Sequence, residues 1–200
     1  MTSVEGWFPA PAQPVLGADE AAVWQVSREM PHPIEAVGAR YLGAPARVTR
    51  TPTGKPQLEG SDLAVSLAHS GAVVLVAIAA GGEVGVDVEL LRPEAAAWAL
   101  VEQALTKREQ AGLDGIAAPA RAESFLRTWT RKEAILKAAG TGLGIDPRRL
   151  ELDDNDVVAV PRQLGQADDW KLADVPLVGY AAAVAVRGRL SSLLLFDAKS

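Results

Sequence analysis

The sequence predicts an α+β fold, in which helices and strands follow one another without the regular alternation of βαβ units. Three observations support this prediction. Apolar runs of strand length lie within residues 63–90, helical patterns occupy 94–111 and 121–139, and short strand-like runs fill residues 148–197. Glycine, proline and aspartate, which are typical turn residues, separate many of these runs.

The first sixty residues are predicted to contain few regular elements. Residues 1–20 are rich in proline and alanine and are expected to be an irregular lead-in. The run AAVWQVS, residues 21–27, predicts an edge strand, and residues 34–43 predict a helix that ends at Gly43. The run RTPTGKPQLEGSD, residues 50–62, has the composition of a loop.

The middle of the chain predicts three strands and then two helices. Residues 63–67, 72–80 and 84–90 are strand-like, with the segment GGE as a turn before the third strand. A helical pattern runs from 94 to 111, and the clearest helix is expected over 121–139, ended by Gly140 and Gly142. Further strands are predicted in the runs RRLELDD, DVVAVPRQL, DWKLADV, VGYAAAVAVRG and LSSLLLFD.

Composition limits the classes of function. A chain of 200 residues with 48% hydrophobic content suits one compact domain or two small halves that share a core. The absence of cysteine excludes disulfides, thiolate zinc sites and cysteine nucleophiles. A net charge of −5 argues against a role in bulk nucleic-acid binding.

The longest apolar runs predict no membrane insertion. Residues 72–80 and 180–186 are shorter than the roughly 20 residues that a spanning helix needs. The N-terminal segment lacks a basic region followed by an apolar one, so no signal peptide is predicted. We therefore expect a cytoplasmic protein.

The run GVDVE, residues 85–89, places two acids on one face of a predicted strand. Because side chains alternate with period two, Asp87 and Glu89 share one face while Val86 and Val88 share the other. Like charges repel, and near a core they are poorly hydrated. The pattern therefore favours a cation bound between the two acids.

The predicted long helix adds a third acid and a base. Trp129, Glu133 and Lys137 are spaced by four residues and therefore lie on one helical face. One interpretation is an ordinary pair between Glu133 and Lys137, as is common on helices. Since the face is otherwise apolar, a site is the alternative, because a buried carboxylate requires a partner. Together with Asp87 and Glu89, Glu133 would form an all-oxygen cluster that suits Mg²⁺, which usually works on substrate phosphates.

The segment from Gly54 to Gly71 offers groups that hold phosphates. Lys55 lies between a glycine and Pro56, and His69 and Ser70 are expected in the turn between two apolar runs. Ammonium, imidazole and hydroxyl donors in loops are typical of such sites. Each residue alone is more often simply part of a turn.

In order and spacing, the motifs GKP, SLAHSG, GVDVE and WTRKEAILK resemble those of the 4′-phosphopantetheinyl transferases of the surfactin-synthetase-activating (Sfp-type) class. The resemblance covers roughly residues 50–145. It implies one chain with two similar α+β halves related by a pseudo-two-fold axis, here 1–84 and 85–200. It also implies transfer of the phosphopantetheine arm of coenzyme A to a serine of an apo acyl or peptidyl carrier protein, with release of 3′,5′-ADP. The carrier could serve fatty-acid, polyketide or nonribosomal peptide synthesis.

The resemblance also implies roles for individual residues. Asp87, Glu89 and Glu133 become Mg²⁺ ligands, and Lys137 a pyrophosphate or proton-handling residue. Glu109, in the run ALTKREQAGL, matches an acid of the family and is a candidate general base. The implied contacts with coenzyme A are Arg40, Lys55, Pro56, His69, Ser70 and Lys137. Because 200 residues can hold both halves of the cleft, we expect a monomer.

Two departures from the family pattern leave an alternative function open. The serine usual before the motif histidine is Ala68 here, so one hydroxyl donor is missing. The family normally has several basic residues in a helix ahead of GKP, but here the run MPHPIE interrupts that pattern. Only Arg28 and Arg40 are then available as candidates for the contact with the 3′-phosphate. The alternative is therefore a catalytically weak or inactive protein of the same fold that binds coenzyme A or acts as a scaffold.

Overall fold

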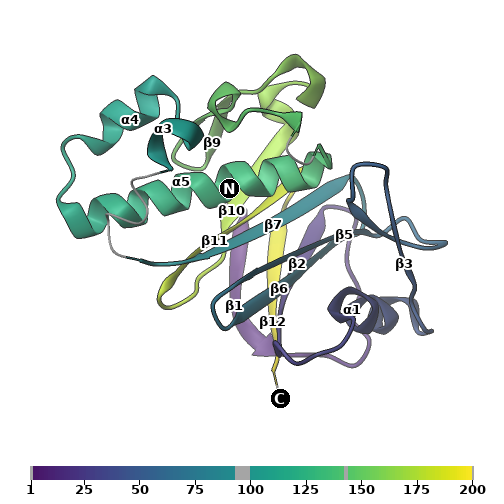
Figure 1. Ribbon diagram of the computed structural model, residues 1–200. Helices are drawn as coiled ribbons and strands as arrows, with labels where there is room; N and C mark the ends of the chain where they lie inside the picture. The colour runs from purple at the N-terminus through teal and green to yellow at the C-terminus, as the bar shows by residue number, and fades with distance from the viewer. Residues whose placement is uncertain (1, 93–99, 142–143, 200) are drawn as a thin grey trace.

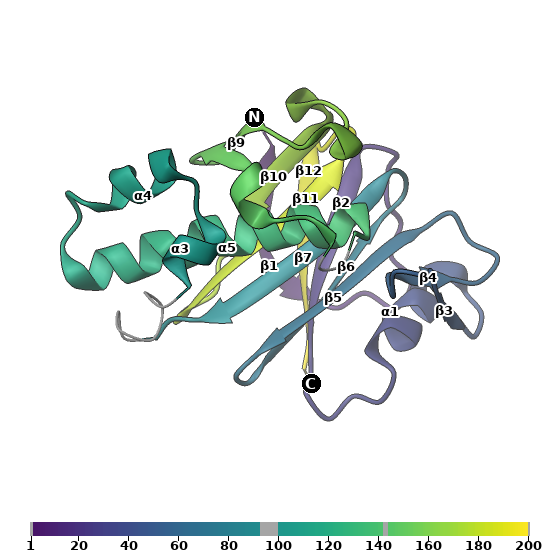
Figure 2. The ribbon, with the colours of Figure 1, turned by 45° about the horizontal axis from the view of Figure 1, so that its top comes forward.

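The computed structural model describes residues 2–92, 100–141 and 144–199, and within these ranges the strands form three sheets. The largest sheet has the order β1-β12-β2-β6-β5-β4-β3, a second has the order β10-β11-β7, and β8 pairs with β9. Figures 1 and 2 show α1 against the largest sheet and α5 lying across the second. The strands and helices are β1 (Ser3–Pro9), β2 (Glu20–Val26), α1 (Pro33–Leu42), β3 (Val48–Arg50), β4 (Pro56–Leu58), β5 (Ala64–Ser70), β6 (Val73–Ala79), β7 (Glu83–Leu90), α3 (Val101–Ala104), α4 (Lys107–Leu113), α5 (Ala118–Ala139), β8 (Glu151–Asp153), β9 (Asp156–Ala159), β10 (Trp170–Asp174), β11 (Tyr180–Arg187) and β12 (Ser192–Ala198).

The mixed α+β class predicted from the sequence is confirmed, and the two main sheets pack face to face. Val86 and Val88 of β7 are buried in the cluster between the sheets, together with Leu75 of β6 and Leu193 of β12. A second cluster fills the space under α1, and α5 packs on the outer face of the smaller sheet. The order of layers is therefore helix, sheet, sheet, helix.

The N-terminal region differs from the sequence-based expectation. Residues 3–9, expected to be irregular, form β1, which pairs in parallel with β12. The predicted edge strand at 21–27 is wrong, because β2 lies between β12 and β6. Its run of buried residues on both faces is typical of a central strand. Strand β12 thus completes the sheet of the N-terminal half.

The predicted helix over 94–111 is not continuous within the part of the chain that the structure describes. Residues 93–99 lie outside the described residues. Thr106 separates α3 from α4 in an extended conformation, and its hydroxyl accepts a hydrogen bond from the backbone N–H of Glu109. A threonine N-cap of this kind starts a new helix.

His69 and Ser70 were expected in a turn, but they are the last two residues of β5.

No helix in the described segments combines the length and the hydropathy that a membrane span requires. The predicted end of the long helix at Gly140 is confirmed, because Gly140 caps α5 with φ of 64°, whereas Gly142 lies outside the described residues. Glycine adopts this left-handed conformation without steric cost. The end of α5 is thereby fixed beside the loop that carries Lys55, whose side chain packs against Gly140.

Candidate active site

Strand β7 presents its acids toward α5, as the alternation predicted. Asp87 is buried and Glu89 is partly buried, while Val86 and Val88 face the core between the sheets. On one side β7 pairs with β11, with Asp87 opposite Ala183. On the other side two hydroxyls of β5 accept hydrogen bonds from β7, Ser66 from Val86 N at 3.2 Å and Ser70 from Leu90 N at 3.0 Å.

Gly85 lets α5 lie directly on β7. A Cβ atom at residue 85 would be 2.0 Å from the carbonyl oxygen of Ala134 and 2.4 Å from the backbone nitrogen of Ala138. No side chain fits in that space. The close approach places Glu133 and Lys137, one turn apart on α5, against the acidic face of β7, where Lys137 Nζ lies 2.6 Å from Asp87 Oδ1.

Burial and mutual repulsion raise the pKa values of two carboxyls in this cluster. The pKa of Asp87 is raised to about 6, mainly by burial and further by Glu89, and Lys137 opposes the shift. The pKa of Glu133 is raised to about 7 by burial and by Asp87 and Glu89, again opposed by Lys137. Among the described residues Glu133 makes no hydrogen bond or ion pair, and Asp87 Oδ2 is buried without a hydrogen-bond partner. The cluster therefore carries more negative charge than its protein partners neutralise.

The carboxylates fit a hard divalent cation by chemistry, although they do not form a finished coordination set. Within the described ranges no group of three or more His, Cys, Asp or Glu side chains is arranged to hold a metal ion. Glu89 Oε2 is engaged by Arg92 at 2.7 Å and by the Ser70 hydroxyl at 3.3 Å. The buried, unpartnered oxygen of Asp87 and the all-oxygen donor set are nevertheless what Mg²⁺ prefers.

The two raised pKa values predict that the metal-free protein loses stability as pH rises. Both carboxyls bind protons more tightly in the folded than in the unfolded protein, where their pKa values are near 3.8 and 4.5. Their contribution to the free energy of unfolding is therefore largest below about pH 4 and falls as pH rises toward about 7. Urea unfolding of the wild type and of Glu133→Gln between pH 5 and pH 8, in chelator, checks this. The wild type should lose more stability over that range than the variant, and parallel curves would contradict the shift at Glu133.

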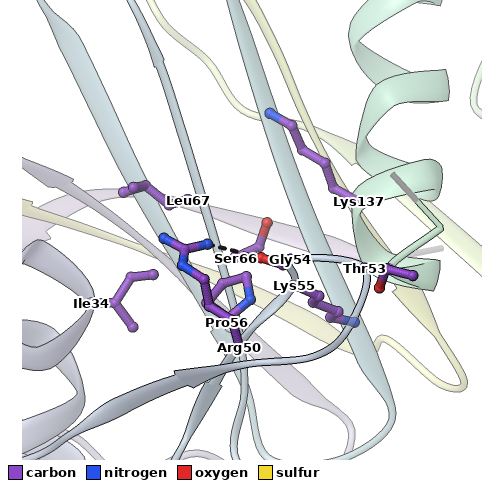
Figure 3. Close-up of a pocket in the computed structure, with 10 residues that line it drawn as sticks. Ile34, Arg50, Thr53, Gly54, Lys55, Pro56, Ser66, Leu67 and Lys137 are labelled. Atoms are coloured by element: carbon purple, nitrogen blue, oxygen red, sulfur yellow. Dashed lines mark hydrogen bonds between the residues drawn. The ribbon is translucent and has the colours of Figure 1, made fainter. Parts of the chain in front are cut away.

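A cavity of about 260 Å³, lined by cationic side chains, lies next to the acidic cluster (Figure 3). Lys55, Arg50 and Lys137 all line it, together with Pro56 and Ser66. Lys55 donates from Nζ to the carbonyl oxygen of Ala138 at the end of α5, and burial lowers its pKa. A second cavity of about 420 Å³ shares Lys55 and Pro56, so these two residues lie between two hollows.

Arg50 and Ser66 were missed by the sequence reasoning. Arg50 is paired with Pro56 across the β3–β4 hairpin, and its guanidinium donates to the carbonyl oxygen of Gly54 at 2.8 Å, as the dashed line in Figure 3 shows. Recognising RTPTGKP as a hairpin would have placed Arg50 beside Lys55. Ser66 lies on the same face of β5 as Ser70, which the period of two in SLAHS also indicates.

Three predicted contact residues, Arg40, His69 and Ser70, are not among the residues that line this cavity. Arg40 donates to the carbonyl oxygen of Pro11 at 2.8 Å, and its guanidinium lies 5.3 Å from the ring centroid of Trp24. It is not among the residues that line the cavity. His69 is exposed and alternates with Ser70, so it projects from the opposite face of β5.

Glu109 is engaged in a buried structural pair. Its Oε2 atom accepts from Lys132 Nζ at 2.5 Å and from Thr106 N at 2.7 Å, and its Oε1 atom accepts from Leu152 N at 3.0 Å. Lys132 is fully buried and also donates to the carbonyl oxygens of Ala104 and Pro147. The pair therefore ties α3, α4 and the segment before β8 to α5.

Breaking this pair should destabilise the protein strongly. Lys132→Met leaves the Glu109 carboxylate buried without a counter-charge, so we expect the free energy of unfolding to fall by about 3–5 kcal/mol. Urea denaturation measures the change. The double variant Glu109→Gln with Lys132→Met removes the uncompensated charge and should recover at least half of the loss. A Lys132→Met protein within about 1 kcal/mol of the wild type would contradict the assignment.

A family model and individual relatives identify the same protein family. The family model described as 4′-phosphopantetheinyl transferase superfamily matches residues 83–185, half of the chain. The chain is 33% identical over 143 residues to the 4′-phosphopantetheinyl transferase HetI of Nostoc sp., covering 68% of this chain and 58% of HetI. It is 31% identical over 136 residues to slr0495 of Synechocystis sp., covering 65% of this chain and 54% of that protein. The chain thus spans little more than half the length of these relatives.

Among solved structures, a holo-(acyl-carrier-protein) synthase from Bacillus anthracis in complex with CoA (3′,5′-ADP) aligns with a TM-score of 0.44 at 22% identity. The alignment covers 52% of this chain and 93% of that protein.

Proposed function

Because this chain belongs to the 4′-phosphopantetheinyl transferase superfamily, we propose that it transfers the 4′-phosphopantetheine arm of coenzyme A to a serine of an apo acyl or peptidyl carrier protein and releases 3′,5′-ADP. The observation that supports this best is the adjacency of two features. Asp87 on β7 raises the pKa of Glu133 on α5 by charge repulsion, and Lys137, which pairs with Asp87, lines a cavity with two further cationic side chains. Transfer of a phosphoryl-linked group depends on this pairing of a divalent-cation site with anion-binding side chains.

Asp87, Glu89 and Glu133 are the proposed ligands of Mg²⁺. Their oxygens, the orphaned Oδ2 atom of Asp87 and the uncompensated charge of the cluster support the assignment. A bound Mg²⁺ would neutralise charge on the pyrophosphate of coenzyme A. The protein itself contributes the fixed spacing of β7 and α5, which Gly85 makes possible.

Lys55, Arg50 and Lys137 are proposed to hold the phosphates of coenzyme A. A lysine whose pKa is lowered by burial gains most from an anion, because the anion restores the favourable environment of the charged form. Pro56 and Ser66 line the same cavity. Ser70 of β5 donates to the carboxylate of Glu89 and accepts from the backbone N–H of Leu90, so it links β5 to β7. His69 and either Arg28 or Arg40 would reach only parts of the substrate that extend beyond the cavity.

Glu133 is the proposed acceptor of the proton from the carrier serine, in preference to Glu109. Among the described residues no protein donor occupies the oxygens of Glu133, so one oxygen can bind the cation while the other accepts the proton. Both oxygens of Glu109 already accept hydrogen bonds from protein donors. We therefore assign Glu109 a positioning role, exerted through Lys132, the residue before Glu133.

We also propose that residues 1–84 and 85–200 are two similar halves in a monomer, with β12 exchanged into the sheet of the first half. Each half has a helix packed on a sheet, α1 on β5 and β6, and α5 on β7 and β11. Strands β5 and β7 meet between them through the hydroxyls of Ser66 and Ser70. Analytical sedimentation tests the proposed monomer. A trimeric protein whose activity is found only in the trimer would contradict it.

The second candidate is a protein that binds coenzyme A without transferring the arm, which the alanine at residue 68 favours. Intact-mass spectrometry of an apo carrier protein, incubated with this protein, coenzyme A and Mg²⁺, separates the two. A gain of one phosphopantetheine mass supports the transferase. Binding of coenzyme A with no gain on fatty-acid, polyketide or peptide carriers would support the alternative.

A further inference from the structure

Lys137 contacts two parts of the site that carry opposite charge. Its Nζ atom lies 2.6 Å from Asp87 Oδ1, and the same side chain lines the cavity that also contains Arg50 and Lys55. The side chain of Lys137 is 34% exposed, so it is not fully enclosed by the acids and retains access to solvent. A lysine has a flexible four-carbon stem, so its charge can move between neighbours while the helix stays fixed.

The other two cations of the cavity have partners of a different kind. Lys55 donates to the backbone carbonyl of Ala138, and Arg50 donates to the backbone carbonyl of Gly54. Neither of these bonds involves a carboxylate of the acidic cluster. Lys137 is therefore the member of this set whose present partner, Asp87, is also a proposed ligand of a divalent cation.

We propose that Lys137 is an exchangeable counter-ion, which neutralises Asp87 until a divalent cation replaces it there and which then binds the phosphate anion in the cavity. This inference rests on the cation site of the proposed function. A divalent cation on Asp87 repels an ammonium group at hydrogen-bond distance from the same carboxylate, so the cation and the ammonium compete for Asp87. Released ammonium raises the positive charge that faces an anion in the cavity.

Cation and anion should therefore bind cooperatively through this one side chain. An anion that attracts Lys137 leaves Asp87 free for the cation, and a cation on Asp87 releases Lys137 for the anion. Linkage requires the two effects to be equal in size. Direct attraction between the two bound ions adds to the cooperativity but does not depend on Lys137.

The test is calorimetric titration of Mg²⁺ into the metal-free protein, with and without sulfate, a tetrahedral anion that binds Mg²⁺ only weakly in water. Lys137→Met removes the competitor, so we expect Mg²⁺ alone to bind this variant about tenfold more tightly than it binds the wild type. Sulfate should tighten Mg²⁺ binding less in Lys137→Met than in the wild type. Lys137→Gln, which removes the charge but keeps a polar side chain, should show the same two changes in Mg²⁺ affinity.

Lys55→Met is the matched control, since it removes a charge from the same cavity without touching Asp87. It should weaken sulfate binding and leave the affinity for Mg²⁺ alone within about twofold of the wild type. Equal tightening of Mg²⁺ in both variants, or no tightening in Lys137→Met, would overturn the proposal. The cation site itself is tested separately by Asp87→Asn, which should abolish Mg²⁺ binding, and unchanged binding there would overturn the site together with the exchange.

Discussion

Glu133→Gln and Asp87→Asn are each expected to leave a folded protein that transfers phosphopantetheine at least about 100-fold more slowly than the wild type. Each substitution removes a negative charge and an oxygen ligand from the cluster that β7 and α5 form. In the absence of metal, Glu133→Gln should not lower the free energy of unfolding near pH 8, because the raised pKa of Glu133 means that its ionised form is destabilising in the folded protein. Initial rates of carrier modification at saturating Mg²⁺, with urea unfolding of the same samples, check both statements.

Glu123→Gln is the control for these substitutions. Glu123 is exposed on the same helix and lies 3.6 Å from Arg127, so the change in charge is identical but falls outside the site. Its variant should keep the rate of the wild type. Near-normal transfer by either Glu133→Gln or Asp87→Asn would remove that residue from the proposed site.

Gly85→Ala is expected to lower the free energy of unfolding by more than about 3 kcal/mol, and Gly85→Val is expected to lower it further. The added Cβ would lie 2.0 Å from the carbonyl oxygen of Ala134, so α5 would have to move away from β7. That movement would also separate Glu133 and Lys137 from Asp87, so activity should fall in whatever fraction remains folded. Urea denaturation and transfer rates measure the two losses.

Gly112→Ala provides the comparison, because nothing lies within 4 Å of a Cβ at that helical position. The higher helix propensity of alanine should raise stability slightly, by no more than about 1 kcal/mol. Equal effects of alanine at residues 85 and 112 would mean that close packing at Gly85 does not hold α5 in place.

The local parts of the site could be predicted from the sequence because they follow from simple periodicities. Alternation in GVDVE puts Asp87 and Glu89 on one face of β7, and four-residue spacing puts Glu133 and Lys137 on one face of α5. The end of α5 at Gly140 follows equally from local chemistry. Buried charge then indicates that these two faces meet.

Other features depend on contacts between distant segments, which no local pattern contains. Strand β1 is held by β12, from the other end of the chain, and the same strand makes β2 a central strand. The role of Glu109 depends on Lys132, and that of Arg40 on Trp24 and Pro11. The sequence around such a polar residue is the same whether its side chain binds a substrate or a buried residue of the protein, so the sequence alone does not distinguish the two roles.

The central claim, that the contact of β7 with α5 forms a phosphopantetheinyl transfer site, is tested most directly by a single-turnover reaction with equimolar protein, coenzyme A and apo carrier. Tandem mass spectrometry locates the modification, and chromatography quantifies 3′,5′-ADP. We predict one phosphopantetheine on the carrier serine for each 3′,5′-ADP released by the wild type, and neither product with Glu133→Gln or in chelator. Release of 3′,5′-ADP without modified serine, or equal modification by Glu133→Gln, would contradict the claim.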